Sequence, residues 1–208
     1  MLGSYSPATR AKSMAQLTDF MVSRVRSKLL KVFLQDPQEM FYVRELTRKV
    51  GEEINAVRRE LERLQKKGIV KSEPRGNRLY YYLRKNYPYY QELLQLVAKT
   101  TGLGGAIRKN RNKLGKIKFV MLSGKFLRRR ERQPNEVDLL VVGNIILPQL
   151  AVIVREEEAR REQEINYTVM TQDEFEFRRR RRDPFLTGIL AGSRVMIMGD
   201  EEELVGQD

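Results

Sequence analysis

Residues 54–84 read INAVRRELERLQKKGIVKSEPRGNRLYYYLR, and the hydrophobic period changes within this stretch at Gly68. Before Gly68, apolar residues recur every three or four positions, which predicts a helix with one buried stripe. The members of that stripe are Ile54, Val57, Leu61 and Leu64. After Gly68 the period shortens to two, and two short strands flank Arg75-Gly76-Asn77, which predicts a β-hairpin.

Two more helices are predicted upstream of this stretch. Apolar residues recur with a helical period over residues 22–34, and Asp36-Pro37 ends that segment. A shorter helix is predicted over residues 41–51, closed by Gly51, and the third helix covers residues 52–67. Three helices followed by a hairpin predict a winged helix-turn-helix domain over residues 22–86.

The third helix has the composition of a helix that reads DNA. With its apolar stripe in the core, the outward positions are Asn55, Arg58, Arg59 and Glu62. Asn and Arg side chains can pair bidentately with adenine and guanine edges in the major groove. The predicted DNA-binding residues, which include the preceding helix and the hairpin, are Arg44, Arg48, Asn55, Arg58, Arg59, Arg63, Lys71, Arg75, Asn77 and Arg78. The alternative is a winged-helix protein-interaction domain with incidental surface arginines.

The charge distribution favours a polyanionic partner for this half of the chain. The 208 residues include 40 Lys or Arg and 27 Asp or Glu, a net charge of +13. Residues 1–100 carry 20 basic and 10 acidic side chains, whereas residues 101–208 carry 20 and 17. The excess lies in the half that contains the predicted hairpin, as expected of a nucleic-acid site.

Residue types that are absent narrow the possible chemistry. The chain has no cysteine and no histidine, which excludes disulfides, thiolate zinc sites and histidine general bases. Three kinds of function are left: carboxylate chemistry with a hard cation such as Mg²⁺, chemistry by a lysine or a hydroxyl group, and binding without chemistry. The sequence has neither a run of roughly 18 apolar residues nor a recognisable secretory leader, so we expect a cytoplasmic protein with no membrane partner.

The front half resembles winged-helix transcriptional regulators of the ArsR/MarR-like kind. The resemblance is carried by Val57-Arg-Arg-Glu-Leu-Glu-Arg-Leu64, by Gly68-Ile-Val70 and by Gly76-Asn77-Arg78. It implies a regulator of transcription that binds double-stranded DNA, and a homodimer.

A second motif lies in residues 119–143, FVMLSGKFLRRRERQPNEVDLLVVG. An apolar strand leads into Gly124, a polar loop follows, and another apolar strand begins at Glu136-Val-Asp138. Alternate residues of a strand face the same side, so Glu136 and Asp138 are expected to point the same way. The motif resembles the nucleotidyltransferase signature, in which one strand ends in Gly-Ser and the next carries Asp-x-Asp.

Residues 22–203 as a whole resemble proteins that fuse a winged helix to a minimal nucleotidyltransferase-like domain. The resemblance implies a nucleotide site at Gly124, Lys125 and Arg128, and a metal site at Glu136 and Asp138. In such sites, acids on neighbouring strands hold Mg²⁺ ions that clamp a triphosphate.

The motif departs from the family pattern at four positions. Lys125 stands in place of Ser, where it could neutralise Asp138, and Glu136 stands in place of the first Asp. Arg129 occupies a second Gly position, and Asn166 falls near a third acid. Each change has a physical cost for Mg²⁺ binding or for close approach of the backbone to a phosphate, although Lys125 could instead bind a phosphate as a P-loop lysine does. We therefore expect no transferase activity and no cofactor, and Mg²⁺ would be needed only if the site were active. The domain would serve ligand sensing, packing or dimerisation.

The predicted fold class is α+β, with the winged helix followed by a small α/β domain that has a mixed sheet. Strands are expected over residues 116–123, 137–142, 165–170 and 194–198, and helices over residues 87–100, 106–114, 147–162, 171–177 and 185–190. The expected organisation is a lead-in (1–21) with a helix from about Ala11, the winged helix (22–86), connecting helices with a hinge at Gly102, Gly104 and Gly105 (87–114), the nucleotidyltransferase-like domain (115–203) and an acidic tail (204–208).

Two further functions stay open. One is an active Mg²⁺-dependent nucleotidyltransferase of a toxin–antitoxin type that modifies a protein. The other is an RNA-binding protein that uses the basic loop of the rear domain. The run Arg178–Arg182 would spread over all faces of a helix, so solvated surface is its default interpretation, with a nonspecific phosphate patch as the alternative.

Overall fold

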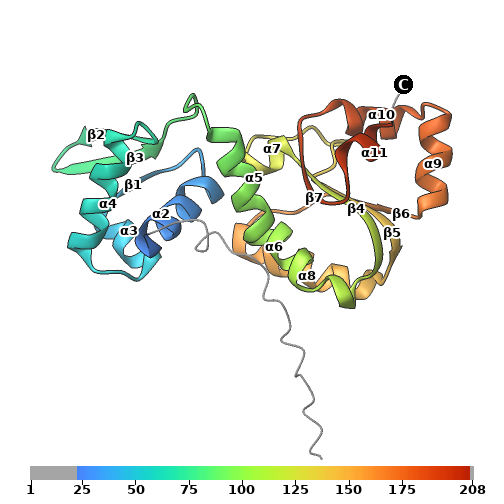
Figure 1. The fold of residues 1–208 in the computed structure, drawn as a ribbon, viewed down its shortest axis with the longest axis horizontal. Coiled ribbons are helices and arrows are strands. Elements are labelled where there is room, and N and C mark those ends of the chain that lie inside the picture. The colour runs from blue at the N-terminus through green and yellow to red at the C-terminus, as the bar shows by residue number, and fades with distance from the viewer. Residues whose placement is uncertain (1–22, 207–208) are drawn as a thin grey trace, which may run out of the picture.

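The computed structural model describes residues 23–206, which form an α+β protein with two sheets (Figure 1). In chain order the elements are α2 (Arg24–Gln35), β1 (Met40–Tyr42), α3 (Val43–Val50), α4 (Ile54–Lys66), β2 (Val70–Arg75), β3 (Arg78–Leu83), α5 (Tyr90–Thr100), α6 (Gly102–Lys109), a 3₁₀ turn (Arg111–Lys113), β4 (Gly115–Ser123), α7 (Gly124–Leu127), β5 (Leu139–Ile145), α8 (Leu147–Arg161), β6 (Tyr167–Met170), α9 (Gln172–Arg180), α10 (Pro184–Ala191), β7 (Arg194–Met198) and α11 (Glu201–Val205). The predicted lead-in, with its helix near Ala11, lies outside the described residues. Within residues 23–206, no helix is long and apolar enough to cross a membrane.

The front part consists of α2, α3 and α4 packed on a small antiparallel sheet with the strand order β1-β3-β2. As predicted, β2 and β3 form a hairpin, in which Arg75 pairs with Arg78 around a tip at Gly76-Asn77. Gly51 and Gly68 follow α3 and α4 with φ values of 61° and 71°, a left-handed conformation that suits glycine and ends both helices.

The strand β1 was not predicted from the sequence. Residues 41–51 were expected to form one helix, but Met40–Tyr42 pair with β3 and α3 begins only at Val43. In this pairing Phe41 lies opposite Tyr81, and both are buried. The added strand satisfies the backbone groups of β3 on the side that β2 does not cover.

The rear part is built on a four-stranded sheet with the order β6-β5-β4-β7. Strand β4 runs antiparallel to β5 and to β7, whereas β5 runs parallel to β6. The predicted α+β class and the mixed sheet are therefore confirmed. Strand β5 starts at Leu139 rather than at the predicted Val137, so Glu136 and Asp138 precede the strand.

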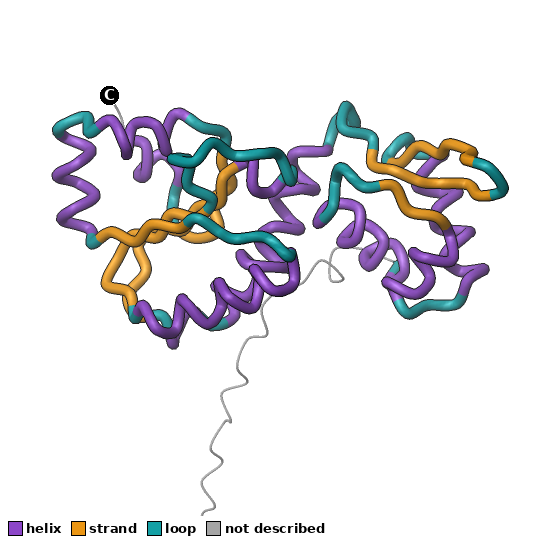
Figure 2. The backbone as a smooth tube through the Cα atoms, turned by 180° about the vertical axis from the view of Figure 1, so that it is seen from behind, coloured by secondary structure: helices purple, strands orange, loops and turns teal. Residues whose placement is uncertain are grey.

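Helices cover both faces of this sheet (Figure 2). Alternate residues of β4 face opposite sides, so Val120 and Leu122 contact one hydrophobic cluster, and Phe119 and Met121 contact another. The first cluster includes residues of α5, α6 and α8, and the second includes residues of α9, α10 and α11. Residues 204–208 were expected to form a tail, but Leu204 and Val205 belong to α11. Leu204 is fully buried, which packs this helix against the second cluster.

One hydrophobic cluster joins the front part to the rear part. It contains Phe33 of α2 and Leu61 of α4, and it continues through Leu94 and Val97 of α5 to Ile197 of β7. Helix α5 lies between the two sheets (Figure 1) and contributes to this shared core. A cut after α5 would expose apolar surface, so functional tests use the full chain.

The glycines expected to form a hinge lie in a tightly packed helix. Gly102, Gly104 and Gly105 belong to α6, which folds back against the end of α5. A Cβ atom on Gly104 would lie 2.2 Å from the carbonyl oxygen of Ala98. On Gly105 it would lie 2.7 Å from the carbonyl carbon of Thr100. These glycines therefore permit close contact between α5 and α6, and the predicted hinge stays a prediction.

Gly104→Ala is expected to lower the free energy of unfolding by about 1–3 kcal/mol, because the methyl group would overlap backbone that cannot move freely. Gly188→Ala is the matched control, because Gly188 also lies in a helix and a Cβ atom there meets nothing within 4 Å. The control should gain up to about 1 kcal/mol from helix propensity. Urea denaturation of both variants measures the difference, and equal effects would contradict the packing argument.

Candidate functional site

Helix α4 presents a polar face opposite its buried one. Val57, Leu61 and Leu64 are buried in the core, and Ile54 is half-buried. The predicted outward residues are all exposed, and they are Asn55, Arg58, Arg59 and Glu62. Their spacing of three and four residues keeps them on one side of the helix. The amide, the two guanidiniums and the carboxylate therefore form a continuous polar surface.

A buried carboxylate fixes α4 against α2. Glu60 is 4% exposed and accepts hydrogen bonds from Arg26 Nε at 2.9 Å and from Arg63 Nη1 at 2.6 Å. Burial alone would raise the pKa of Glu60, but the hydrogen bonds from Arg63 and Arg26 hold it below the usual value. Arg63 was predicted to bind DNA, and the structure shows that it is also part of this anchor.

The hairpin carries the other predicted basic residues on its exposed surface. Lys71, Arg75, Asn77 and Arg78 are all exposed. The Arg78 guanidinium lies 4.6 Å from the ring centre of Tyr42, and Arg75 lies 6.0 Å from that of Tyr80. Stacking on an aromatic face orients a guanidinium without neutralising its charge, and Arg75 in addition pairs with Glu73 at 3.0 Å.

Tyr42 of β1 links α3 to the hairpin and was missed from the sequence. Its hydroxyl accepts a hydrogen bond from Arg48 Nη2 at 3.2 Å, while Arg78 stacks on its ring. Arg44, one turn before Arg48 on α3, is exposed as well. Since Tyr42 belongs to a three-residue strand without a recognisable period, only the pairing of β1 with β3 reveals its position.

In the rear part, the two predicted metal ligands are engaged by basic side chains. Glu136 pairs with Lys125 and accepts a hydrogen bond from the Gln133 N–H at 2.9 Å. Asp138 is 2% exposed, pairs with Arg132 at 3.2 Å and accepts the Asn166 N–H at 3.0 Å. Lys125 therefore neutralises Glu136, and not Asp138 as the sequence suggested.

These residues do not fit a Mg²⁺ site. Burial raises the pKa of Asp138 above its usual value, although the Asn166 N–H and the Arg132 charge oppose the shift. The hydrogen bond from Lys125 lowers the pKa of Glu136, so that carboxylate is already satisfied by a cation. Within residues 23–206, no group of three or more Asp, Glu, His or Cys side chains is placed to hold a metal ion.

The residues implied as a nucleotide site are divided between two environments. Gly124 is buried, and its N–H already donates to the Ser193 carbonyl at 2.6 Å. Arg128 donates to Ser193 Oγ at 3.1 Å and to Gln91 Oε1 at 2.9 Å. Lys125 is partly exposed and lines a cavity beside α10. Of the three, Lys125 is the residue best placed to meet a ligand.

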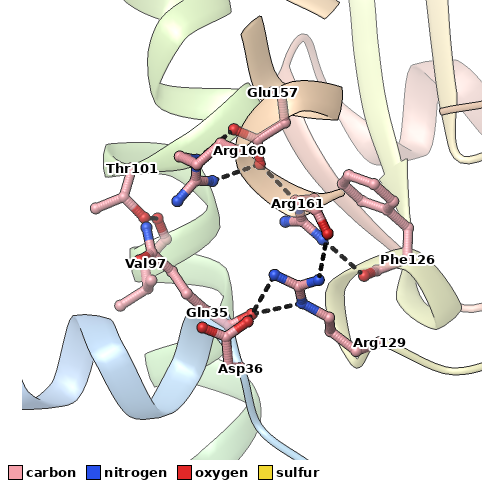
Figure 3. Close-up of polar contacts among 9 residues, drawn as sticks. All are labelled: Gln35, Asp36, Val97, Thr101, Phe126, Arg129, Glu157, Arg160 and Arg161. Atoms are coloured by element: carbon pink, nitrogen blue, oxygen red, sulfur yellow. Dashed lines mark hydrogen bonds and ion pairs between the residues drawn. The ribbon is translucent and has the colours of Figure 1, made fainter. Parts of the chain in front are cut away.

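Arg129 joins the front part to the rear part (Figure 3). Its guanidinium pairs with Asp36 Oδ1 at 2.6 Å and donates to the carbonyls of Gln35 and Arg161, each at 3.4 Å. Two helices, α2 and α8, thus direct their negative C-terminal ends at one cation. Arg129 has a φ of 50°, a left-handed conformation that residues other than glycine adopt less often.

The arginine-rich run of α9 is bound mainly to its own surroundings. Arg178 pairs with Glu174 at 2.9 Å, and Arg179 donates to the Glu203 carbonyl at 2.7 Å. The Arg181 guanidinium lies 4.6 Å from the ring centre of Phe177. Two of these contacts are made with residues of α9 and one with α11, and the run continues past the end of α9 at Arg180.

No protein-family model matches this chain, and no curated protein does. The chain is similar to a solved structure described as a possible transcriptional regulator from Methanosarcina mazei Go1. The sequence identity is 14%, the match covers 44% of this chain and 77% of that chain, and the TM-score is 0.32. A likeness at this level carries no argument about function.

Proposed function

We propose that this protein is a transcriptional regulator that binds double-stranded DNA through a winged helix-turn-helix in residues 22–86. The observation that carries the proposal is the exposed face of α4, where Asn55, Arg58 and Arg59 stand opposite a buried apolar stripe. A helix with such a face can enter the major groove and hydrogen-bond to base edges. Arg44 and Arg48 of α3 are exposed beside it and would bind phosphates.

The hairpin supplies the wing of this proposed interface. Its exposed cations, Lys71, Arg75 and Arg78, would contact the backbone or the minor groove next to the site read by α4. The stacking of Arg78 on Tyr42 supports the proposal, because it holds a charged side chain of the wing near α3. We further propose that the protein acts as a homodimer, which light scattering of the purified chain would test.

For residues 115–203 we propose a nucleotidyltransferase-like domain that no longer transfers nucleotides. The pairing of Glu136 with Lys125, and the burial of Asp138 beside Arg132, support this proposal. Both carboxylates would have to exchange an internal cation for Mg²⁺. The domain would then serve ligand sensing or packing.

The function is tested by binding of the full chain to 30-base-pair duplex DNA across a salt series. We expect a linear fall of log affinity with log salt, because each phosphate contact releases counterions. Single-stranded RNA of matched sequence is the comparison. Weak, salt-insensitive duplex binding would contradict the proposal, and preference for RNA would favour the alternative that the rear loop binds RNA.

Millimolar Mg²⁺ is expected to leave the melting temperature unchanged and to support no transfer of labelled nucleotide to protein. The physical reason is that Glu136 and Asp138 are already paired with Lys125 and Arg132, so Mg²⁺ would have to displace a cationic side chain from each carboxylate. Differential scanning fluorimetry and a labelling assay measure the two effects. A Mg²⁺-dependent rise in melting temperature that Asp138→Asn abolishes would favour the active nucleotidyltransferase instead.

A further inference from the structure

A cavity of about 570 Å³ lies beside the ion pair of Lys125 and Glu136. It is enclosed by the turn after β4, by the segment before β5, and by α10 with the residues that follow it. Its walls are mainly apolar and include Val137, Phe185 and Ile189. A volume of this size, with apolar walls and few polar groups, is typical of small-molecule sites.

We infer that this cavity binds a small organic monoanion with an apolar body, and that the bound anion acts on the DNA-binding elements through Arg128. The inference rests on the proposed function for its biological meaning. Lys125 is the one cation among the described residues that line the cavity. Its carboxylate partner is 37% exposed, so a ligand anion can replace Glu136 at little cost in desolvation.

The charge of the cavity argues against a nucleoside triphosphate. A triphosphate carries several negative charges, which proteins neutralise with metal ions and more than one cationic side chain. Here a single lysine is available, and Glu136 adds a negative charge beside it. One anionic group on Lys125, with the remaining atoms against Phe185 and Ile189, satisfies both the charge and the apolar walls.

The wall of the cavity is connected to the front part by hydrogen bonds. Ser193, which lines the cavity, accepts a hydrogen bond from Arg128 Nη1 at 3.1 Å. The backbone carbonyl of Arg128 accepts from Gln38 Nε2 at 2.9 Å, and Gln38 in turn accepts from Lys85, just after β3. The path therefore runs from the cavity to the base of the hairpin.

The segment made of α7, which carries Lys125, and the residues that follow it is also held by the front part. The Arg130 N–H donates to the Lys125 carbonyl at 3.0 Å, and Arg129 pairs with Asp36. A non-glycine residue with a φ of 50° is held in that conformation by its surroundings. A shift of Lys125 toward a ligand therefore changes the position of Arg128 and Arg129 together.

Binding is tested with two fluorescent probes that share an apolar body. One is 8-anilinonaphthalene-1-sulfonate, a monoanion, and the other is N-phenyl-1-naphthylamine, which lacks the sulfonate. We expect the anionic probe to bind more tightly. Lys125→Gln should weaken its binding by at least about tenfold, the effect of losing one charge-assisted hydrogen bond. Gly188→Leu should abolish it, because Gly188 lines the cavity and faces open space.

Transmission is tested by hydrogen–deuterium exchange of residues 36–42 with and without saturating anionic probe. We expect the probe to change exchange there in the parent protein, and the change to be lost in Gln38→Ala, which leaves the cavity intact. Gln95→Ala, on the exposed side of α5, is the control and should keep the change.

Three results would overturn the inference. Equal affinity for the two probes, or binding unaffected by Gly188→Leu, would overturn the anion site. Binding without a change in residues 36–42 would overturn the transmission. None of these measurements requires DNA. A failure of duplex binding would therefore contradict the proposed function without contradicting the anion site or its link to residues 36–42.

Discussion

Glu157→Ala is expected to lower the free energy of unfolding by about 3–5 kcal/mol, because it leaves a buried guanidinium without its counter-charge. Glu157 and Arg161 are both on α8, and each side chain is 6% exposed. Arg161 Nε donates to Glu157 Oε1 at 2.6 Å, and Arg160 donates to the same carboxylate at 2.5 and 3.0 Å. Burial lowers the pKa of Arg161, and the hydrogen bond and charge of Glu157 oppose that shift.

The surroundings of this pair explain why the loss should be large. The Arg161 guanidinium lies 4.0 Å from the ring centre of Phe126, and its Nη1 donates to the Phe126 carbonyl at 3.3 Å. The Arg161 carbonyl also accepts from Arg129, which joins the front part to the rear part (Figure 3). A displaced Arg161 therefore disturbs both the core of the rear part and the contact with α2.

Urea denaturation of the full chain measures the effect. The control is Glu156→Ala, an exposed neighbour on the same helix, for which we expect a change within about 0.5 kcal/mol. Replacing Glu157 and Arg161 together with Met should recover most of the stability, because no unpaired charge is left in the interior. If Glu157→Ala costs no more than Glu156→Ala, water reaches the pair and the burial argument fails.

Elements with a long, regular period were predictable from the sequence. The stripe of α4 and the alternation of the hairpin gave their types and approximate bounds, and Gly51 and Gly68 marked the helix ends correctly. The strands of the rear part and the helices α5, α8, α9 and α10 were predicted within about three residues of their observed bounds, whereas α7 and α11 were not predicted and α6 begins at Gly102 rather than at residue 106. Local periodicity indicates which face of an element is buried, and these elements do bury that face in the folded protein.

Features that depend on distant residues were not predictable. Strand β1 has three residues and exists because β3 pairs with it. The glycines of α6 resemble a linker in sequence, yet they lie where α5 and α6 touch. The contact of Arg129 with Asp36 joins residues 93 positions apart in the sequence. No local pattern encodes any of these contacts.

The candidate site shows the same division. The exposure of Asn55, Arg58 and Arg59 followed from the helical period. The partner of Lys125 did not follow from any sequence period. Glu136 and Asp138 were expected to lie on one strand, whereas both precede β5 and pair with different cations. Strand alternation therefore does not apply to them, and the sequence could not tell which carboxylate Lys125 neutralises.

Replacing both Arg58 and Arg59 with Ala is expected to reduce sequence discrimination by about 1–3 kcal/mol per side chain, if these residues contact base edges. Both lie on the exposed face of α4, on the same side as Asn55. Discrimination is measured as the ratio of affinities for a duplex selected from a random pool and for an unselected duplex of equal length. Nonspecific affinity should fall much less than this ratio.

Replacing both Arg75 and Arg78 is expected to have a different effect from the pair on α4. These residues flank the hairpin tip, so their loss should weaken binding to all sequences and reduce the salt slope by about 1 per phosphate contact. They also stack on Tyr80 and Tyr42, which contributes about 0.5–1 kcal/mol per contact to folding at exposed sites. A thermal melt of this variant must therefore accompany the binding measurement.

The double substitution of Arg111 and Arg155 removes the same charge from exposed positions of the rear part. It controls for net charge, because a general loss of positive charge weakens DNA binding without regard to position. If this control lowers the affinity for DNA as much as the hairpin variant does, long-range attraction accounts for the affinity and the hairpin is not a wing. If the pair on α4 and the pair on the hairpin lose discrimination equally, the division between base reading and phosphate binding is wrong. Only a loss of discrimination confined to Arg58 and Arg59 supports α4 as the helix that reads the DNA.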